Sequence, residues 1–120
     1  MFINCSNHKS SDWSKEQLDA ARMYGDIVEI PFPAVKADST MEEIESTAEE
    51  ICSRIVTLSP TCVMCQGEFT LTYALVKRLL IAGINTVAAC AERSVEEKKL
   101  EDGSTQKTAV FRFVGFRNYK

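Results

Sequence analysis

The chain has 120 residues, a length that suits a single domain with one contiguous core. Hydrophobic residues make up 45% and charged residues 26% of it, which excludes a disordered or fibrous chain. The net charge of -3 argues against binding of duplex nucleic acid, because that requires a basic surface. No apolar run reaches the roughly 18 residues that span a bilayer, and no secretory signal is evident, so we expect a cytoplasmic protein without membrane contact.

The N-terminal half alternates short apolar runs with helical segments. Residues 2–5 predict a first strand, and a polar loop of eight residues follows it. Ser14 and Gln17 have the spacing of a capping box, which predicts that a helix begins there. Residues 26–32 predict a second strand. An apolar stripe with spacings of three and four residues then predicts an amphipathic helix over residues 41–58.

The C-terminal half continues this alternation and then changes to strands alone. The predicted segments are a strand at 61–65, a helix at 68–82, a strand at 84–91, and a hairpin with strands at 92–100 and 105–116. The hairpin is predicted because Asp102-Gly103 is a strong turn signal. This order predicts an α/β fold with a Rossmann-like, mostly parallel sheet, helices on both faces and a C-terminal antiparallel hairpin. We expect one domain over residues 1–120.

The cysteines invite a metal or redox interpretation, because Cys62 and Cys65 stand three residues apart. Residues at that spacing on a strand point to opposite faces, so the two thiols cannot converge. No second pair of Cys or His residues completes a zinc set. We therefore expect free thiols that serve as small core residues, and neither a metal nor a cofactor.

Two loops are candidates for a ligand site. In open parallel sheets, ligands bind at the carboxyl ends of the strands where strand order reverses. With the order 2-1-3-4, the loops that start at Ser6 and Gln66 become neighbours. Gln66-Gly67-Glu68 leads into a helix without a usual N-cap residue, so we expect its first amides, with the Thr70 hydroxyl, to be open to an anion. The alternatives are that Gly67 is a simple cap and that Glu68, which would repel a phosphate, complements the helix dipole.

Other single residues are open to two interpretations each. His8 is the only histidine, a residue type that exchanges protons near neutral pH, so it is a candidate general acid or base or else an exposed loop residue. Trp13 suits a hydrophobic staple better than a base-stacking platform. Arg93 is a candidate to bind a phosphate or to pair with nearby glutamates. The last predicted strand, 105–116, is apolar on both faces, which suits a central or dimer-covered strand.

Several stretches together resemble one known group of proteins. They are Ser-Asn-His after the first strand, QGEFTLTYALV, GINTV followed by CAERSVEE, and KTAVFRFVGFRNY. These stretches resemble the small stand-alone ring nucleases of type III CRISPR systems, which are related to the CRISPR-associated Rossmann-fold (CARF) sensor domains. The likeness covers most of the chain and is clearest from Gln66 onward. It implies a single CARF-like domain that forms a homodimer and binds a cyclic oligoadenylate across the two-fold axis.

The resemblance also implies a reaction, the metal-independent opening of a cyclic oligoadenylate, with cyclic tetra-adenylate as the expected ring. A ribose 2′-hydroxyl would attack the adjacent phosphate, and the cleavage would switch off antiviral signalling by the CRISPR system. In this interpretation, amides near Gly67 hold the phosphates, and His8 or Glu68 transfers protons. The other ligand-binding residues would be Ser6, Asn7, Gln66, Thr70 and Arg93. Ring nucleases share no single catalytic set, so these roles are hypotheses.

Two further classes of function are open on the same sequence. One is a protein of this fold that senses or sequesters the cyclic nucleotide without cleaving it. The other is a small interaction domain that has no nucleotide ligand.

Overall fold

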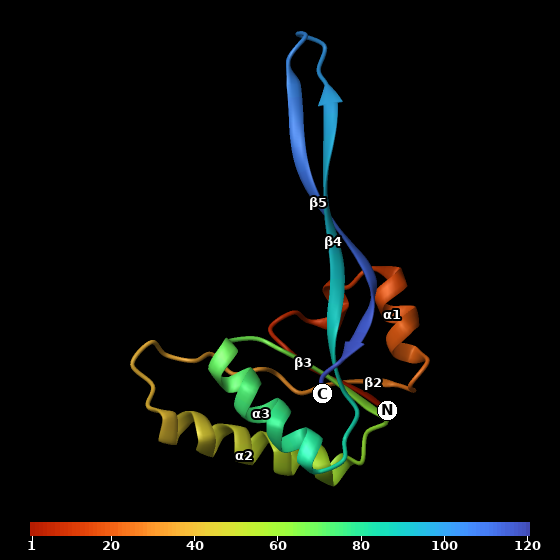
Figure 1. The fold of residues 1–120 in the computed structure, drawn as a ribbon. Helices are drawn as coiled ribbons and strands as arrows, with labels where there is room; N and C mark the ends of the chain where they lie inside the picture. The colour runs from red at the N-terminus through yellow and green to blue at the C-terminus, as the bar shows by residue number, and fades with distance from the viewer.

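A five-stranded sheet with the strand order β2-β1-β3-β4-β5 organises the computed structural model, which describes residues 1–120 (Figure 1). The strands are β1 (Phe2–Ser6), β2 (Ile27–Glu29), β3 (Cys62–Gln66), β4 (Thr86–Lys99) and β5 (Thr105–Asn118). The first four strands are parallel, and β5 runs antiparallel to β4. The predicted fold class is therefore confirmed, and the strand order 2-1-3-4 that was assumed for the site is the observed one.

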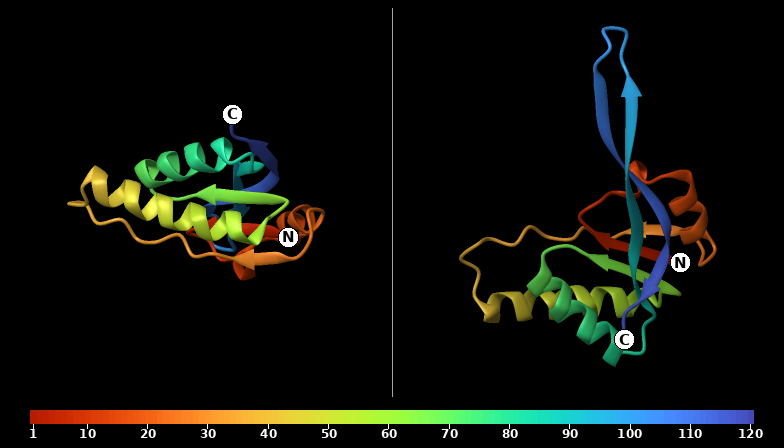
Figure 2. Two further views of the ribbon diagram at one scale, coloured as in Figure 1. Left: turned by 90° about the horizontal axis from the view of Figure 1, so that it is seen from below. Right: turned by 45° about the horizontal axis from the view of Figure 1, so that its top comes forward.

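Helices cover both faces of the sheet (Figure 2). The helices are η1 (Ser10–Asp12), α1 (Lys15–Arg22), α2 (Met41–Leu58) and α3 (Phe69–Ile81). On the face of α1, a small core forms around Phe2, Cys62 and Met64, whereas α2 and α3 pack on a larger core that includes Cys65. Cys62 and Cys65 thus lie on opposite faces, as the strand period predicts. None of the helices combines the length and the apolar character that crossing a membrane requires.

The helix α1 begins where its capping box predicts, and α2 begins at a cap of the same kind. The Ser14 hydroxyl accepts a hydrogen bond of 3.2 Å from the Gln17 amide, and α1 starts at the next residue. Thr40 accepts in the same way from the Glu43 amide at 3.2 Å, which starts α2. These hydrogen bonds satisfy amides that the first turn of a helix leaves unpaired. Local sequence chemistry therefore determines both boundaries.

The main correction concerns β4. The predicted strand at 84–91 and the first predicted hairpin strand at 92–100 form one continuous strand of 14 residues. No glycine, proline or turn signal separates the two segments, so nothing interrupts the extended backbone. β3 ends at Gln66, and beyond that level β4 and β5 continue alone as a two-stranded ribbon (Figure 1).

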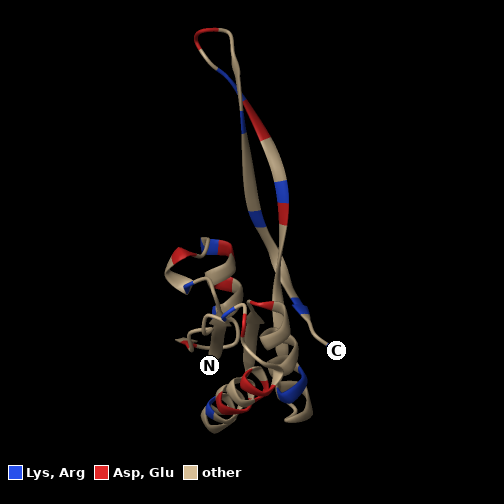
Figure 3. Ribbon diagram, turned by 90° about the vertical axis from the view of Figure 1, so that its left-hand side faces the viewer, with Lys and Arg blue, Asp and Glu red and all other residues tan.

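We refer to this ribbon, residues 91–113, as the arm. It gives the chain a longest dimension of 57 Å and a radius of gyration of 17.3 Å. A compact domain of this length has a radius of gyration of roughly 14 Å. The arm carries charges of both signs along its length (Figure 3). An isolated two-stranded ribbon is only marginally stable in water, so the arm lacks the packing that would normally support it.

The position of β5 corrects a second expectation. β5 lies at the edge of the sheet, which excludes the central alternative for the last strand and leaves the dimer-covered alternative as a prediction. Within the single chain the strand is also uncovered, because the Phe111 side chain is 71% exposed and that of Val114 61% exposed. Its C-terminal end is anchored, since the Tyr119 hydroxyl donates a hydrogen bond of 2.8 Å to the carbonyl oxygen of Cys65.

Candidate functional site

A cavity of about 530 Å³ lies on the α1 face of the sheet, between α1 and the base of the arm. Small-molecule sites commonly have volumes of roughly 300–1,000 Å³. Its lining comes from the loop after β1, η1, the start of α1, the end of β3, the first half of β4, and β5. Among the residues that line it are His8, Trp13, Gln66, Phe111 and Phe113. The cavity therefore lies at the carboxyl edge of the sheet, where β1 and β3 are neighbours and strand order reverses.

Small and large side chains both line the cavity. Ala89 and Ala91 line it on β4, together with the larger side chains of Trp13, Phe111 and Phe113. Aromatic rings around a polar-edged cavity suit a flat unsaturated ligand, such as a nucleobase. Trp13 also packs edge-on against Phe2, with ring centroids 6.2 Å apart and an interplanar angle of 82°. This contact holds the indole in place beside the cavity.

A buried polar network positions the loop that carries His8. The Asn4 side chain donates hydrogen bonds of 2.9 Å to the carbonyl oxygen of His8 and 2.9 Å to Glu29 Oε2. The Ser6 hydroxyl donates to Asn4 Oδ1 at 2.6 Å and accepts from the His8 amide at 3.2 Å. Asn4 and Ser6 are both buried. The backbone of His8 is therefore held by side chains of β1, while its side chain lines the cavity.

The two predicted loops are neighbours, as expected. Ser6 pairs with Gln66 in the parallel register of β1 and β3, and the Asn7 amide donates a hydrogen bond of 3.3 Å to the Gln66 carbonyl oxygen. Ser6, however, uses its hydroxyl within the buried network and is not among the residues that line the cavity. Asn7 is exposed and does not line the cavity. Of the residues in the first loop that were predicted to bind ligand or transfer protons, His8 alone lines it.

Gln66 is the last residue of β3, and its side chain connects two strands at the floor of the cavity. Gln66 Oε1 accepts a hydrogen bond from the backbone amide of Ala89 on β4. The regular β3–β4 pairing ends at Met64 and Val87, so this contact continues the connection by a side chain. Because the carbonyl group of the amide is engaged, its Nε2 donors remain for a ligand in the cavity.

The prediction that the first amides of α3 are open to an anion is wrong. Glu68 is itself the N-cap, and its carboxylate accepts hydrogen bonds from the amides of Leu71 at 2.8 Å and Thr70 at 3.0 Å. The Thr70 hydroxyl donates to the same carboxylate at 2.7 Å. These bonds, with that from the Leu71 amide contributing most, lower the pKa of Glu68. An ionised carboxylate at this helix end repels a phosphate, and Thr70 is engaged as part of the cap.

Gly67 has a packing role. A β-carbon at this position would lie 2.5 Å from Phe32 Cε1, far inside van der Waals contact. The ring of Phe32 packs on the core formed with α2 and α3, opposite the cavity. The close approach that Gly67 permits is therefore to an aromatic ring of the same chain.

Arg93 lies on the arm and not in a loop at the rim of the sheet. It pairs with Phe111 across the two strands and points to the same side as the residues that line the cavity. Arg93 is exposed and belongs to no ion pair within the chain. No Lys or Arg lines the cavity, so its charged groups in one chain are limited to Asp12 and the titratable His8.

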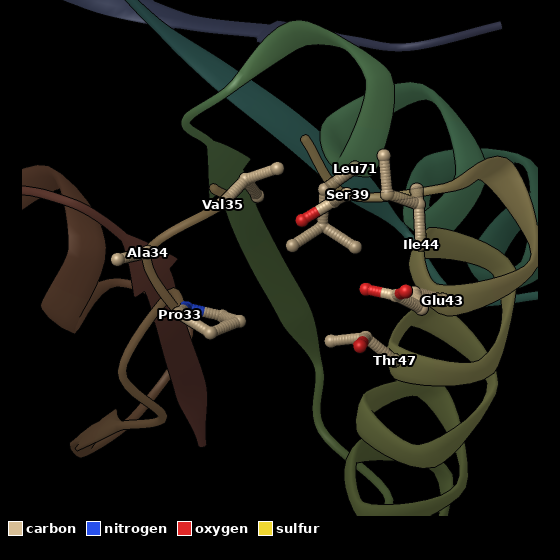
Figure 4. A pocket seen from close by; sticks show the side chains of 8 residues that line it. All are labelled: Pro33, Ala34, Val35, Ser39, Glu43, Ile44, Thr47 and Leu71. Carbon is tan, nitrogen blue, oxygen red and sulfur yellow. The ribbon is translucent and has the colours of Figure 1, made fainter. Parts of the chain in front are cut away.

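A second cavity, of about 100 Å³, lies on the opposite face between the β2–α2 connection and α2 (Figure 4). Pro33 and Val35 border it on one side, and Glu43 and Thr47 of α2 border it on the other. This volume accommodates a few water molecules. One carboxylate and no basic side chain line it, so it does not suit an anionic ligand.

The structure adds residues that the sequence analysis did not select. Asn4 and Glu29 hold the His8 loop, and Asp12 and Gln17 line the cavity. Asn4 carried a readable signal, because a polar side chain in the middle of an apolar strand needs partners when it is buried. The sequence gives no such signal for Asp12 and Gln17, since their position depends on how α1 packs against the sheet.

Comparison with known proteins assigns the chain to a family. The model of the Uncharacterized protein MJ1673 family matches residues 1–117, and the chain belongs to that family. No curated protein matches the chain. No solved structure matches it. The matched part includes every residue that lines the cavity on the α1 face of the sheet.

Proposed function

We propose that this member of the MJ1673 family is a ring nuclease that binds and cleaves a cyclic oligoadenylate, with cyclic tetra-adenylate as the expected ring. The observation that carries the proposal is the cavity at the carboxyl edge of β1 and β3, where His8 lies among aromatic side chains. The resemblance of the sequence to type III CRISPR ring nucleases supports the same ligand. The protein would act in the cytoplasm and end the signal that activates the CRISPR response.

The lining of the cavity suits an adenine nucleotide. Trp13, Phe111 and Phe113 offer ring faces on which a base can stack, and stacking of this kind tolerates a sugar-phosphate on one side. The free amide donors of Gln66 suit an acceptor nitrogen at the edge of adenine. A ring with two-fold symmetry would be shared by two copies of the chain, each of which receives half of it.

The proposed reaction needs one well-placed proton carrier. The ribose 2′-oxygen forms a bond to the adjacent phosphorus, and the bond from that phosphorus to the 5′-oxygen breaks. The 2′-hydroxyl proton passes to a base and the 5′-oxygen gains a proton, which leaves a linear product with a cyclic phosphate at one end. His8 is the residue assigned to this transfer, because it lines the cavity on a loop fixed by Asn4 and Ser6.

The engagement of Glu68 in the cap of α3 favours a second candidate function, that of a protein which binds the same ligand without cleaving it. The Glu68 carboxylate is occupied by the cap of α3, and its lowered pKa makes it a poor proton donor near neutral pH. Of His8 and Glu68, only His8 then remains available to transfer protons. If His8 alone is insufficient, the protein would sequester or sense the ring.

One experiment separates the candidates. Purified protein is incubated with cyclic tri-, tetra- and hexa-adenylate in the presence of a metal chelator, and both binding and ring opening are followed. Opening of the cyclic tetra-adenylate ring supports the ring nuclease. Saturable binding without opening supports the sequestering protein and contradicts the nuclease. Absence of binding to all three rings contradicts both and leaves an interaction domain without a nucleotide ligand.

A further inference from the structure

The arm has two chemically different faces. Residues that lie opposite each other on β4 and β5 point to the same side, and successive pairs alternate between the two sides. The pairs on the side of the cavity are Ala91-Phe113, Arg93-Phe111, Val95-Ala109, Glu97-Lys107 and Lys99-Thr105. We call this side the cavity-side face. The opposite face is polar, with pairs such as Glu92-Arg112 and Glu96-Thr108.

The cavity-side face is apolar near the body and lacks any cover. Ala91, Val95, Ala109, Phe111 and Phe113 form a row along it, and this row continues the apolar lining of the cavity. The exposed fraction is 57% for Val95 and 71% for Phe111. Burial of such side chains contributes favourably to association, whereas their exposure along an unsupported ribbon does not stabilise the fold.

The charges of the arm favour a second copy of the same chain as the partner. Between residues 91 and 113 there are five acidic and five basic side chains, so the arm has no net charge (Figure 3). A nucleic acid or an anionic surface would need a basic excess. A neutral arm with both signs of charge can instead pair with its own copy without net repulsion.

We propose that the cavity-side faces of two arms pack against each other in a dimer, with the two-fold axis passing through the pair Val95-Ala109 and perpendicular to the arms. In this arrangement the two arms run antiparallel. A residue pair on the body side of Val95-Ala109 in one arm faces the pair at the same distance on the tip side in the other arm. Arg93 therefore faces Glu97 of the second copy, and Phe111 faces Lys107. Both contacts join complementary groups, an ion pair and a cation over an aromatic ring.

The same geometry brings a basic residue to each cavity. The pair Lys99-Thr105 near the tip of one arm faces the pair Ala91-Phe113 at the base of the other, and Ala91 and Phe113 line the cavity. The Lys99 ammonium of one copy thus lies at the cavity of its partner. This part rests on the proposed function, because it supplies the positive charge that a phosphate ligand needs and that the cavity of one chain lacks.

Charge reversal tests the dimer without reference to any ligand. Sedimentation or light scattering should show that the wild-type chain is a dimer, whereas Arg93→Glu and Glu97→Arg each raise the dissociation constant at least about tenfold. In a dimer of either variant alone, residues 93 and 97 of opposite copies carry the same charge, and the two-fold axis repeats this repulsive contact. An equimolar mixture of the two variants restores two attractive contacts and should recover the dimer. Glu96→Lys, on the opposite face of the arm, is the matched control and should leave the dimer intact.

Two outcomes would overturn the proposed dimer. One is a monomeric wild-type chain, and the other is a mixture of the variants that associates no better than either variant alone. For the cavity, Lys99→Glu should leave the dimer intact and weaken binding of cyclic tetra-adenylate at least about tenfold. Unchanged affinity would contradict the placement of Lys99. If neither Lys99→Glu nor wild type binds any ring while the dimer persists, the proposed function fails and the dimer stands.

Discussion

The carboxylate of Glu68 accepts a hydrogen bond of 2.8 Å from the backbone amide of Leu71, in the first turn of α3. This contact closes the helix end that the sequence predicted to be open. The ligand proposed above would therefore lie on the other face of the sheet, in the cavity lined by His8 and Trp13. The contact with Leu71 also lowers the pKa of Glu68, because the ionised form is the one that accepts these hydrogen bonds.

Glu68→Gln is expected to destabilise the fold near neutral pH. The folded-state pKa of Glu68 lies below the unfolded-state value of about 4.3, so its contribution is fully present above that value. The contribution is lost as the pH falls through the folded-state pKa. Urea unfolding of both proteins from neutral to acid pH should therefore give midpoints that converge below about pH 4. A large loss of ring opening in this variant, with an unchanged midpoint at neutral pH, would show that Glu68 is a catalyst.

Gly67→Ala should destabilise the protein through its contact with Phe32. The new methyl group would lie 2.5 Å from the ring and force it to move, at a cost of about 1–3 kcal/mol. The free energy of unfolding measured with urea checks this value. In the double variant Gly67→Ala, Phe32→Leu the methyl group has room, so adding Gly67→Ala to Phe32→Leu should cost less than it does in the wild type. Equal costs in both backgrounds would show that the contact with Phe32 is not the reason why position 67 requires glycine.

Asn4→Leu should loosen the loop that carries His8. The substitution removes the partner of Glu29 Oε2 and the hydrogen bond from the Ser6 hydroxyl to Asn4 Oδ1, which costs about 1–3 kcal/mol in the free energy of unfolding. Hydrogen exchange at the His8 amide should become faster, because local opening of the loop requires less free energy. Asn7→Ala, in the same loop but exposed, is the control and should change stability by less than about 0.5 kcal/mol. If the His8 amide of Asn4→Leu exchanges as slowly as that of the wild type, Asn4 does not position the loop.

His8→Ala is expected to separate catalysis from binding. Loss of a proton carrier typically lowers turnover by about 10²- to 10⁴-fold, and we expect at least a tenfold decrease in the rate of ring opening. Affinity for cyclic tetra-adenylate should change little, because the aromatic rings and Gln66 remain. Single-turnover rates and equilibrium titration of both proteins provide the comparison. An unchanged rate would remove His8 from the mechanism.

The sequence predicted those parts of the fold that depend on local chemistry. Ser14 predicted the start of α1, because its hydroxyl caps an amide three residues further on. The alternation of strands and helices predicted the mostly parallel sheet, and the strand order 2-1-3-4, which was assumed, correctly brought Ser6 next to Gln66. The CxxC cysteines were correctly placed on opposite faces, and burial raises the pKa of Cys62 to about 11.

The parts that were missed depend on contacts between distant segments. Gly67 is required by Phe32, which comes from the connection after β2, and no local pattern contains that contact. Glu68 was not recognised as a cap because glutamate is an uncommon N-cap residue. The polar stretch after Ala91 suggested a new element, whereas its continuation as one strand is stabilised by pairing with β5. The cavity arises from the same long-range pairing, because β5 brings Phe111 and Phe113 to its edge.

The fluorescence of Trp13 gives the most direct test of the central claim, that the cavity receives a cyclic oligoadenylate. Trp13 is the only tryptophan in the chain and lines the cavity, so its emission reports on that site alone. Titration with cyclic tetra-adenylate under a metal chelator should produce a saturable change in emission. Ala91→Phe, which fills the cavity, should abolish the change, while Ser94→Phe on the opposite face of the arm should retain it. An emission spectrum that is unaffected by the ligand, or a response that Ala91→Phe leaves intact, would contradict the claim.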